Sequence, residues 1–135
     1  MRVVIDTNVL VSGIINPHGA PGRIVDALLA EQISLLFDDR MMDEYREVLL
    51  RPAFSFPRGD VDTLLDFIEF ASERISAVAA AGVLLPDVDD LPFLEVAIAG
   101  SADALVTGNV KHFRPTRGRH DVLICSPAGF LDSLM

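Results

Sequence analysis

Three carboxylates of this sequence stand where they could bind a metal ion: Asp6, Glu44 and Asp90. They come from separate segments of the chain, so only the fold can bring them together. Their ligand atoms are hard oxygens with no histidine among them, a set that suits Mg²⁺ or Mn²⁺ and not zinc. Such an ion, once bound, lowers the pKa of a water molecule and makes it a nucleophile. The sequence therefore predicts a site for metal-assisted hydrolysis.

Asp6 follows the run Arg2–Ile5, which is apolar apart from Arg2 and rich in β-branched residues. This pattern predicts a buried strand that ends at Asp6. In open parallel sheets, ligands bind outside the carboxyl ends of the strands. Asn8 could orient the Asp6 carboxylate through a hydrogen bond. The alternative, that Asp6 only begins a turn or caps the next segment, stays open at this point.

Glu44 belongs to a helix predicted over Met41–Leu50, at helical spacing from Met41 and Val48. That spacing puts its carboxylate on or beside the apolar stripe of the helix. A half-buried carboxylate costs free energy unless it is paired or binds a cation. Two readings remain: Glu44 is a metal ligand, or it forms a salt bridge with Arg51 at the helix end.

Asp87, Asp89 and Asp90 precede a short apolar helix predicted over Pro92–Ala99. One of them would serve as the N-cap of that helix. Three carboxylates so close together exceed what capping requires, and they repel one another unless a cation neutralises them. Glu95 lies five positions after Asp90, roughly 140° around a helix, so we expect this weak candidate to point elsewhere.

A second apolar strand, predicted over Ala104–Thr107, runs into Gly108 and Asn109. Because parallel strands end at the same edge of a sheet, this turn is expected to open beside Asp6. Asn109 could give an oxygen to a metal or to its bound water. Gly-Asn also suits a plain turn, which is the simpler reading of these residues alone. His112 is expected to anchor the segment that follows.

Strands and helices alternate along the whole chain. The predicted strands are Arg2–Ile5, Ile33–Phe37, Val83–Leu85, Ala104–Thr107 and Val122–Cys125, and the predicted helices are Pro21–Gln32, Met41–Leu50, Asp60–Ile75, Pro92–Ala99 and Pro127–Leu134. This alternation indicates an α/β fold with a parallel sheet. The length of 135 residues suits a single domain over 1–135, with Arg51–Gly59 as a hinge between two helices.

The formal net charge of −9 disfavours a module that binds nucleic acid by phosphate neutralisation alone. Bound metal ions reverse the local sign, so a carboxylate cluster can still become a phosphate site. The one basic stretch, Lys111–His120, would either hold a nucleic-acid backbone or form a solvated loop.

Cys125 is the only cysteine, so no disulfide can form within the chain and a reducing, cytoplasmic setting is expected. It stands in an apolar strand and is expected to be a small core residue. No apolar run reaches the roughly 18–20 residues of a membrane-spanning helix, and the N-terminal run is far too short for a signal peptide.

Three stretches of the chain, taken in order, resemble the motifs of PIN-domain nucleases. The first is Val3–Ser12 (VVIDTNVLVS), the second is Met42–Leu49 (MDEYREVL), and the third runs from Asp87 to Phe113. Their order and spacing span nearly the whole chain. The sequence is most similar to PIN proteins described as toxins of toxin–antitoxin pairs, related to the VapC toxins.

The resemblance implies a three-layer α/β/α domain with a mainly parallel central sheet, and Mg²⁺- or Mn²⁺-dependent cleavage of RNA that leaves a 5′-phosphate. The acidic positions of the family correspond to Asp6, Glu44 and Asp90, and Asp87 matches a position that is often acidic in this subgroup. The fourth position, often Asp in the family, is Asn109 here. The loss of that charge could weaken a second metal site or leave a one-metal enzyme.

The resemblance also implies an antitoxin partner, which would insert a basic or apolar segment near the site, and a homodimer. Apolar helix surface around Ile24–Leu29 or Leu64–Phe70 could serve the second contact.

Three other functions compete with this one. A degenerate PIN fold would only bind partners. A receiver-like signalling domain would need its acceptor at Asp38 or Asp39, somewhat early, and lacks the acidic pair expected after the first strand. A phosphatase with an aspartate nucleophile would need an acid where Asn8 stands.

Overall fold

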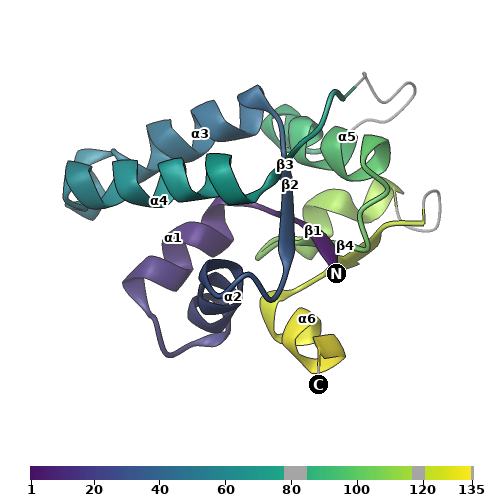
Figure 1. The fold of residues 1–135 in the computed structure, drawn as a ribbon. Coiled ribbons are helices and arrows are strands. Elements are labelled where there is room, and N and C mark those ends of the chain that lie inside the picture. Colours follow the sequence, from purple (N-terminus) through teal and green to yellow (C-terminus); the bar gives the residue numbers. More distant parts are fainter. Residues whose placement is uncertain (78–84, 117–120, 135) are drawn as a thin grey trace.

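The chain folds around a five-stranded sheet with the order β3-β2-β1-β4-β5 (Figure 1). The computed structural model describes residues 1–77, 85–116 and 121–134. The strands are β1 (Arg2–Ile5), β2 (Ser34–Phe37), β3 (Glu73–Arg74), β4 (Ala104–Val106) and β5 (Leu123–Cys125). Every neighbouring pair is parallel, which confirms the α/β class predicted from the sequence.

The central strand β1 is apolar because it is covered on both faces. Val3, Val4 and Ile5 are fully buried, and the register pairs Val3 with Ala104 and Ile5 with Val106. Strands buried on both faces of a parallel sheet read as continuous hydrophobic runs, which is why this segment was recognisable. The buried residues of the described part of the chain form one hydrophobic cluster.

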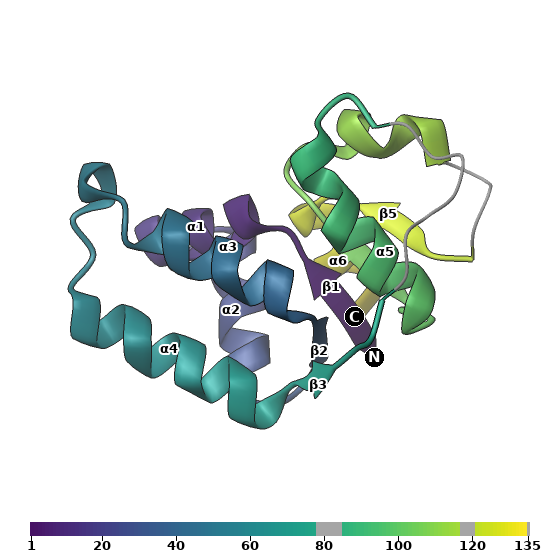
Figure 2. The same cartoon turned by 90° about the horizontal axis from the view of Figure 1, so that it is seen from above.

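Six α-helices surround the sheet in the described part of the chain: α1 (Thr7–Ile15), α2 (Ala20–Leu29), α3 (Asp39–Leu49), α4 (Arg58–Ala71), α5 (Leu91–Ala99) and α6 (Pro127–Leu134). Helix α5 packs on β1, β2 and β4 from one face, and α1, α2 and α6 cover the other (Figures 1 and 2). Helices α3 and α4 pack side by side as a hairpin that extends past β3. The result is a three-layer α/β/α domain.

Helix α1 is the one α-helix of the described residues that the sequence pattern did not predict. Its residues Val9, Leu10 and Val11 are consecutive buried apolar residues, so they show no helical alternation. The helix is stabilised by its contact with α2, where a Cβ on Gly13 would lie 2.6 Å from Val25 Cγ2. The close approach of two helices, a tertiary feature, therefore decides this segment.

The helix predicted over Asp60–Ile75 ends earlier, at Ala71, and the residues after it form strand β3. The Ile75 N–H donates to the Phe37 carbonyl at 2.7 Å, so the sheet supplies hydrogen bonds that a longer helix would have supplied. Likewise α2 ends at Leu29 and not at Gln32, because Glu31 adopts a left-handed φ of 57°.

The other predicted elements are found within a few residues of their expected ends. Arg51–Gly59 connects α3 to α4 as expected and contains the 3₁₀ turn Pro52–Phe54. The predicted strand Val83–Leu85 is not among these, because positions 83 and 84 lie outside the described residues. Within the described ranges, no helix combines the length and the hydropathy needed to cross a membrane.

Candidate active site

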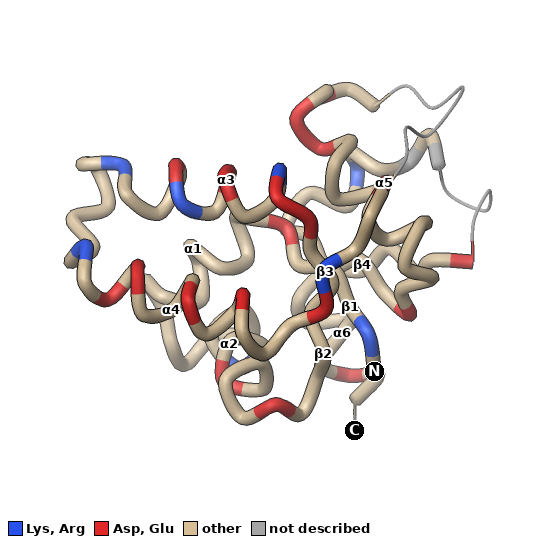
Figure 3. Tube along the Cα trace, turned by 45° about the horizontal axis from the view of Figure 1, so that its top comes forward, with Lys and Arg blue, Asp and Glu red and all other residues tan. Residues whose placement is uncertain are grey.

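An open pocket of about 340 Å³ lies at the carboxyl edge of the sheet, where the strand order reverses between β1 and β4. Such a reversal is the usual ligand site of an open α/β sheet. The structure brings all four candidate residues to this pocket, together with two further acids. The acids that line it are Asp6, Glu44, Asp87, Asp89 and Asp90, and the amides are Asn8 and Asn109. We call it the acidic pocket. Figure 3 shows acidic positions along α3 and in the turn ahead of α5, two of the elements that supply it.

Asp6 is 5% exposed and occupies the N-cap position of α1, yet its side chain caps nothing. Its Oδ2 instead accepts a hydrogen bond from Thr107 Oγ1 at 2.7 Å. Burial raises the pKa of Asp6 above its ordinary value, and repulsion from Asp90 raises it further, while the Thr107 hydrogen bond opposes both. The capping alternative is therefore wrong for this side chain.

Glu44 is half-buried on the face of α3 that looks into the acidic pocket. Thr7 Oγ1 donates a hydrogen bond to its Oε2. Burial raises its pKa, and repulsion from Asp6 acts in the same direction. The salt bridge expected with Arg51 as an alternative is absent from the described contacts, because Arg51 pairs with Glu47 at 3.5 Å. A neutral hydroxyl, not a cation, holds this carboxylate.

Asp90 stands at the start of α5, and its side chain also makes no capping hydrogen bond. Its Oδ2 lies 3.1 Å from His112 Nδ1. Burial raises the pKa of Asp90 above its ordinary value, the contact with His112 opposes that rise, and repulsion from Asp87 adds to it. Asp87 does cap, since its Oδ1 accepts from the Asp89 N–H at 2.9 Å. Asp87 therefore caps the 3₁₀ turn Val88–Asp90 and not the helix predicted over Pro92–Ala99, and the side chain of the buried Asp90 is not used for capping.

Asn109 is an exposed residue on the rim of the acidic pocket. Its N–H donates to Thr107 Oγ1 at 3.0 Å, so the same hydroxyl orders the turn after β4 and holds Asp6. Asn8 does not orient Asp6 as expected. Its Oδ1 accepts a hydrogen bond from the Gly108 N–H at 3.3 Å. A side chain at position 108 would crowd this contact, because its Cβ would lie 3.3 Å from Asn8 Oδ1.

The hydroxyls of Thr7 and Thr107 were not predicted from the sequence, and His112 was expected only to anchor the segment after Asn109. Each of these side chains hydrogen-bonds one acid of the pocket. Both threonines sit directly at the carboxyl end of a buried strand, next to Asp6 in one case and after Val106 in the other. A hydroxyl at a strand end beside an acid was therefore the available signal.

The side-chain oxygens of the acidic pocket suit a hard cation such as Mg²⁺, although they do not form a complete coordination shell. In the described part of the chain, no Lys or Arg forms an ion pair with Asp6, Glu44 or Asp90. No group of three or more His, Cys, Asp or Glu side chains among the described residues is close enough to hold a metal ion as it stands. Mg²⁺ keeps several of its waters, so two direct carboxylates with bridging waters satisfy it.

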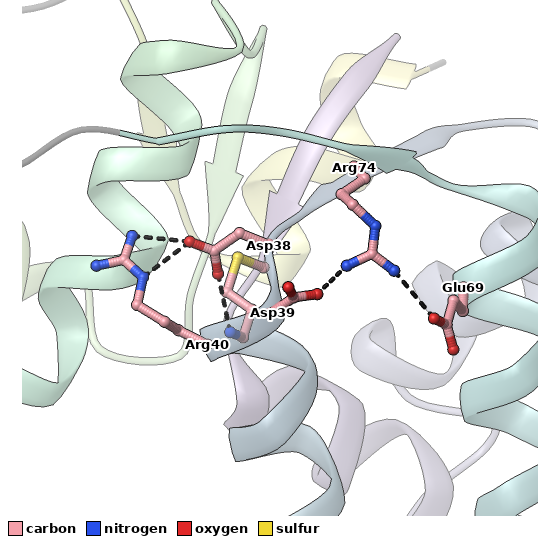
Figure 4. Close-up of polar contacts among 6 residues, drawn as sticks. Asp38, Asp39, Arg40, Glu69 and Arg74 are labelled. Atoms are coloured by element: carbon pink, nitrogen blue, oxygen red, sulfur yellow. Dashed lines mark hydrogen bonds and ion pairs between the residues drawn. The ribbon is translucent and has the colours of Figure 1, made fainter.

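Glu95 does not line the acidic pocket. It is buried in α5, where its Oε1 lies 2.7 Å from Arg40 Nη1. Arg40 also pairs with Asp38 at 2.8 Å, and Arg74 pairs with Asp39 and, at 2.9 Å, with Glu69 (Figure 4). We call this set the arginine-bridged cluster: Asp38, Asp39, Arg40, Glu69, Arg74 and Glu95.

Cys125 is half-buried against the core, and burial raises the pKa of its thiol to about 11.

The basic stretch Lys111–His120 is described only in part, because positions 117–120 lie outside the described residues. Lys111 is exposed.

Fold and pocket together define a class of protein: an α/β/α domain with a parallel sheet whose carboxyl edge collects acids from three elements. The family model of the PIN domain matches residues 2–111. The chain belongs to the PIN-domain family.

An uncharacterized protein from Methanocaldococcus jannaschii is 30% identical over 112 residues, which cover 81% of this chain and 71% of that relative. Among solved structures, a VapBC2 complex from Rickettsia felis bound to a promoter DNA fragment is similar with a TM-score of 0.58 and 20% identity, covering 93% of this chain and 98% of that chain. VapBC-1 from nontypeable Haemophilus influenzae gives a TM-score of 0.62 and 16% identity, covering 95% and 99%. Because both sequence identities are low, the two solved structures bear on the fold of this chain and on nothing finer.

Proposed function

We propose that this protein is a divalent-metal-dependent endoribonuclease and the toxin of a toxin–antitoxin pair. The observation that carries the proposal is the acidic pocket itself. Asp6, Glu44 and Asp90 share it, each has a raised pKa, and none is neutralised by an arginine or lysine among the described residues. Carboxylates that repel one another in a desolvated site are stabilised by a bound cation.

Each residue has a separate duty in this site. Asp6 and Asp90 would hold Mg²⁺ or Mn²⁺, and Glu44 and Asn109 would contribute directly or through water. When bound, the ion lowers the pKa of a water and stabilises the charge that develops on the phosphate. Thr107 and Thr7 fix the rotamers of Asp6 and Glu44, so that the carboxylates are oriented before the ion arrives. His112 does the same for Asp90.

The toxin role rests on the two VapBC structures that share the fold. The antitoxin would be a small protein that inserts a basic or apolar segment near the acidic pocket. A basic segment would complement the negative charge of this pocket. We expect the pair to act in the cytoplasm.

For the expected homodimer, the surface around Ile24–Leu29 offers less apolar area than expected, because Ile24 and Leu28 are buried and Leu29 is 46% exposed. Helix α4 is the stronger candidate of the two, since Phe70 is 92% exposed.

Cleavage by charge-neutral variants tests the proposed activity. Asp6→Asn and Asp90→Asn should each lower the rate of cutting of a single-stranded RNA with Mn²⁺ by at least about 100-fold, because each removes a negatively charged metal ligand. Asp132→Asn, on the exposed face of α6, is the matched control and should cut like the wild type. Undiminished cutting by both site variants would reject the assignment.

A degenerate PIN domain that only binds partners is the second candidate. Asn109 in place of an acid, and the lack of a ready-made group of three ligands among the described residues, favour it. Isothermal titration with Mn²⁺ separates the two functions: the degenerate domain would show no binding that depends on Asp6 and Asp90. The receiver-like alternative is disfavoured, because the chain belongs to the PIN-domain family and both possible acceptors are already paired, Asp38 with Arg40 and Asp39 with Arg74.

A further inference from the structure

Tyr45 is a fully buried polar side chain that stands next to Glu44 on α3. Its hydroxyl donates a hydrogen bond to the carbonyl of Ile5 at 2.5 Å, across 40 positions of the sequence. Ile5 is the residue before Asp6. One hydrogen bond therefore joins the immediate sequence neighbours of two acids of the acidic pocket.

This hydrogen bond lies at the end of β1, beyond the residue pairs that join β1 to β2. Those pairs are Arg2 with Ser34 and Val3 with Leu35. A side chain of α3 thus supplies a donor to the last residue of β1. Because a buried hydroxyl and a buried carbonyl each cost free energy when they are unpaired, the contact fixes the position of α3 along β1.

The ring of Tyr45 also reaches the third element that supplies the acidic pocket. It packs against the ring of Phe93, with centroids 6.2 Å apart and an interplanar angle of 48°. Phe93 is buried in α5, shortly after Asp90. One side chain of α3 therefore contacts both β1 and α5, the elements beside which Asp6 and Asp90 stand.

The direction of Glu44 depends on how its helix is placed. Successive residues of an α-helix are about 100° apart around the axis, so a fixed Tyr45 also fixes the direction in which Glu44 leaves the helix. Thr7 Oγ1 holds the Glu44 carboxylate only at its tip. The Tyr45 hydrogen bond instead fixes the helix itself relative to Ile5, and therefore the separation of Glu44 from Asp6.

We propose that Tyr45 is a positioning residue of the acidic pocket, and that its hydrogen bond to Ile5 holds Glu44 and Asp6 at the separation at which they share one divalent cation. Tyr45 does not itself line the acidic pocket. Groups that orient metal ligands from outside the coordination shell change metal affinity by roughly 10- to 100-fold when they are mutated. This inference rests on the proposed function and adds a residue that sets the metal affinity of the same site.

Tyr45→Phe tests the inference, because it removes the hydroxyl and keeps the ring. The affinity for Mn²⁺, measured without RNA from the electron paramagnetic resonance signal of the unbound ion, should fall by about tenfold. Ile68→Val is the matched control: Ile68 is fully buried in α4, which contributes none of the described residues that line the acidic pocket. It should lose a similar amount of stability in urea denaturation and still bind Mn²⁺ like the wild type.

A double-mutant cycle shows whether Tyr45 acts through Glu44. In Glu44→Gln, Asp6 and Asp90 would still hold the ion. Adding Tyr45→Phe to this variant should lower the affinity by less than about twofold, because the acid that Tyr45 positions is already neutralised. A merely structural role would give the same loss in both backgrounds. If Glu44→Gln binds no Mn²⁺, the comparison of Tyr45→Phe with Ile68→Val decides.

The outcomes separate this inference from the function on which it rests. Unchanged Mn²⁺ affinity in a folded Tyr45→Phe, or an equal loss in Ile68→Val, overturns the inference while metal binding by the wild type stands. If the wild type binds no Mn²⁺, the proposed metal site fails and the inference fails with it.

Discussion

The acidic pocket and the arginine-bridged cluster lie at the carboxyl ends of neighbouring strands and are built from the same residue types, yet their acids are treated differently. After β2, Asp38 and Asp39 are each paired with an arginine (Figure 4). One of these arginines, Arg40, also reaches across to Glu95 of α5. After β1 and β4, Asp6 and its neighbours are held by threonine hydroxyls and a histidine.

The two regions differ in how much of the charge and hydrogen bonding of each carboxylate is satisfied. An arginine satisfies a carboxylate in charge and in hydrogen bonds together, so the paired acids fasten α3, β3 and α5 to one another. A hydroxyl satisfies only part of the hydrogen bonding and leaves the charge. Burial and mutual repulsion then raise the pKa of Asp6, Glu44 and Asp90. Acids of the first kind stabilise the fold, and acids of the second kind are ready for a cation.

The largest expected difference between the regions is the response to metal. Mn²⁺ at about 100 times its dissociation constant should stabilise the wild type by about 2.7 kcal/mol, because the ion binds only the folded state. Asp90→Asn should abolish this gain, and Arg74→Met in the arginine-bridged cluster should keep it. Thermal denaturation with and without Mn²⁺ measures both. If Mn²⁺ stabilised the Asp90→Asn variant as much as the wild type, the acidic pocket would not be the metal-binding region.

Removing the central cation of the arginine-bridged cluster should come next. Arg40→Met takes the partner from Asp38 and from the buried Glu95, and should lower the free energy of unfolding by about 2 kcal/mol. The figure is reduced from that of a fully buried pair because the Arg40 side chain is 47% exposed. Urea denaturation measures it. Arg40→Lys keeps the charge without the planar fork and should recover part of the loss; full stability of Arg40→Met would mean that the cluster contributes nothing.

Neutralising one acid in each region should change stability in opposite directions. Without metal, Asp6→Asn should raise the free energy of unfolding by about 1 kcal/mol or less, because it removes a desolvated charge, whereas Asp38→Asn should lower it. The raised pKa of Asp6 means that its carboxyl favours the folded state below the ordinary pKa of about 4 and loses that contribution as the pH rises through the folded-state pKa. The gain from Asp6→Asn should thus appear at pH 7 and vanish near pH 3 in urea denaturation. A loss for Asp6→Asn at pH 7 would contradict it.

The smallest effect is expected from an ion pair outside both regions. Arg46 and Asp62 join α3 to α4 at 3.0 Å with side chains 41% and 42% exposed. Because water screens such a pair, Arg46→Met should change the free energy of unfolding by less than about 0.5 kcal/mol in the same urea experiment. A loss as large as that of Arg40→Met would show that pairing itself, and not burial, sets the strength of the arginine-bridged cluster.

Much of this arrangement was predictable from sequence where one local signal decides it. The run before Asp6 is so apolar that it predicts a buried strand, and the Ala104–Thr107 run predicts a second strand ending at the same edge. Helical spacing placed Glu44 on or beside the apolar stripe of its helix, but it left open whether this carboxylate binds a metal or pairs with Arg51. The signals failed where two elements meet: α1 depends on the contact of Gly13 with α2, and β3 on hydrogen bonds from β2.

The sequence by itself determined which residues could form a metal site with hard oxygen ligands. Apolar runs that end in Asp or in Thr-Gly-Asn can be recognised without knowledge of the fold. Only the tertiary structure decided which acids keep their charge exposed to a ligand. Asp38 and Asp6 each follow a buried strand. The partner of Asp38 is close in the sequence, because Arg40 of the next helix stands two residues after it, while the partner of Asp6 is Thr107, which follows β4 and lies 101 residues away. Such long-range pairing is fixed by the order of strands in the sheet, which no short window of sequence contains.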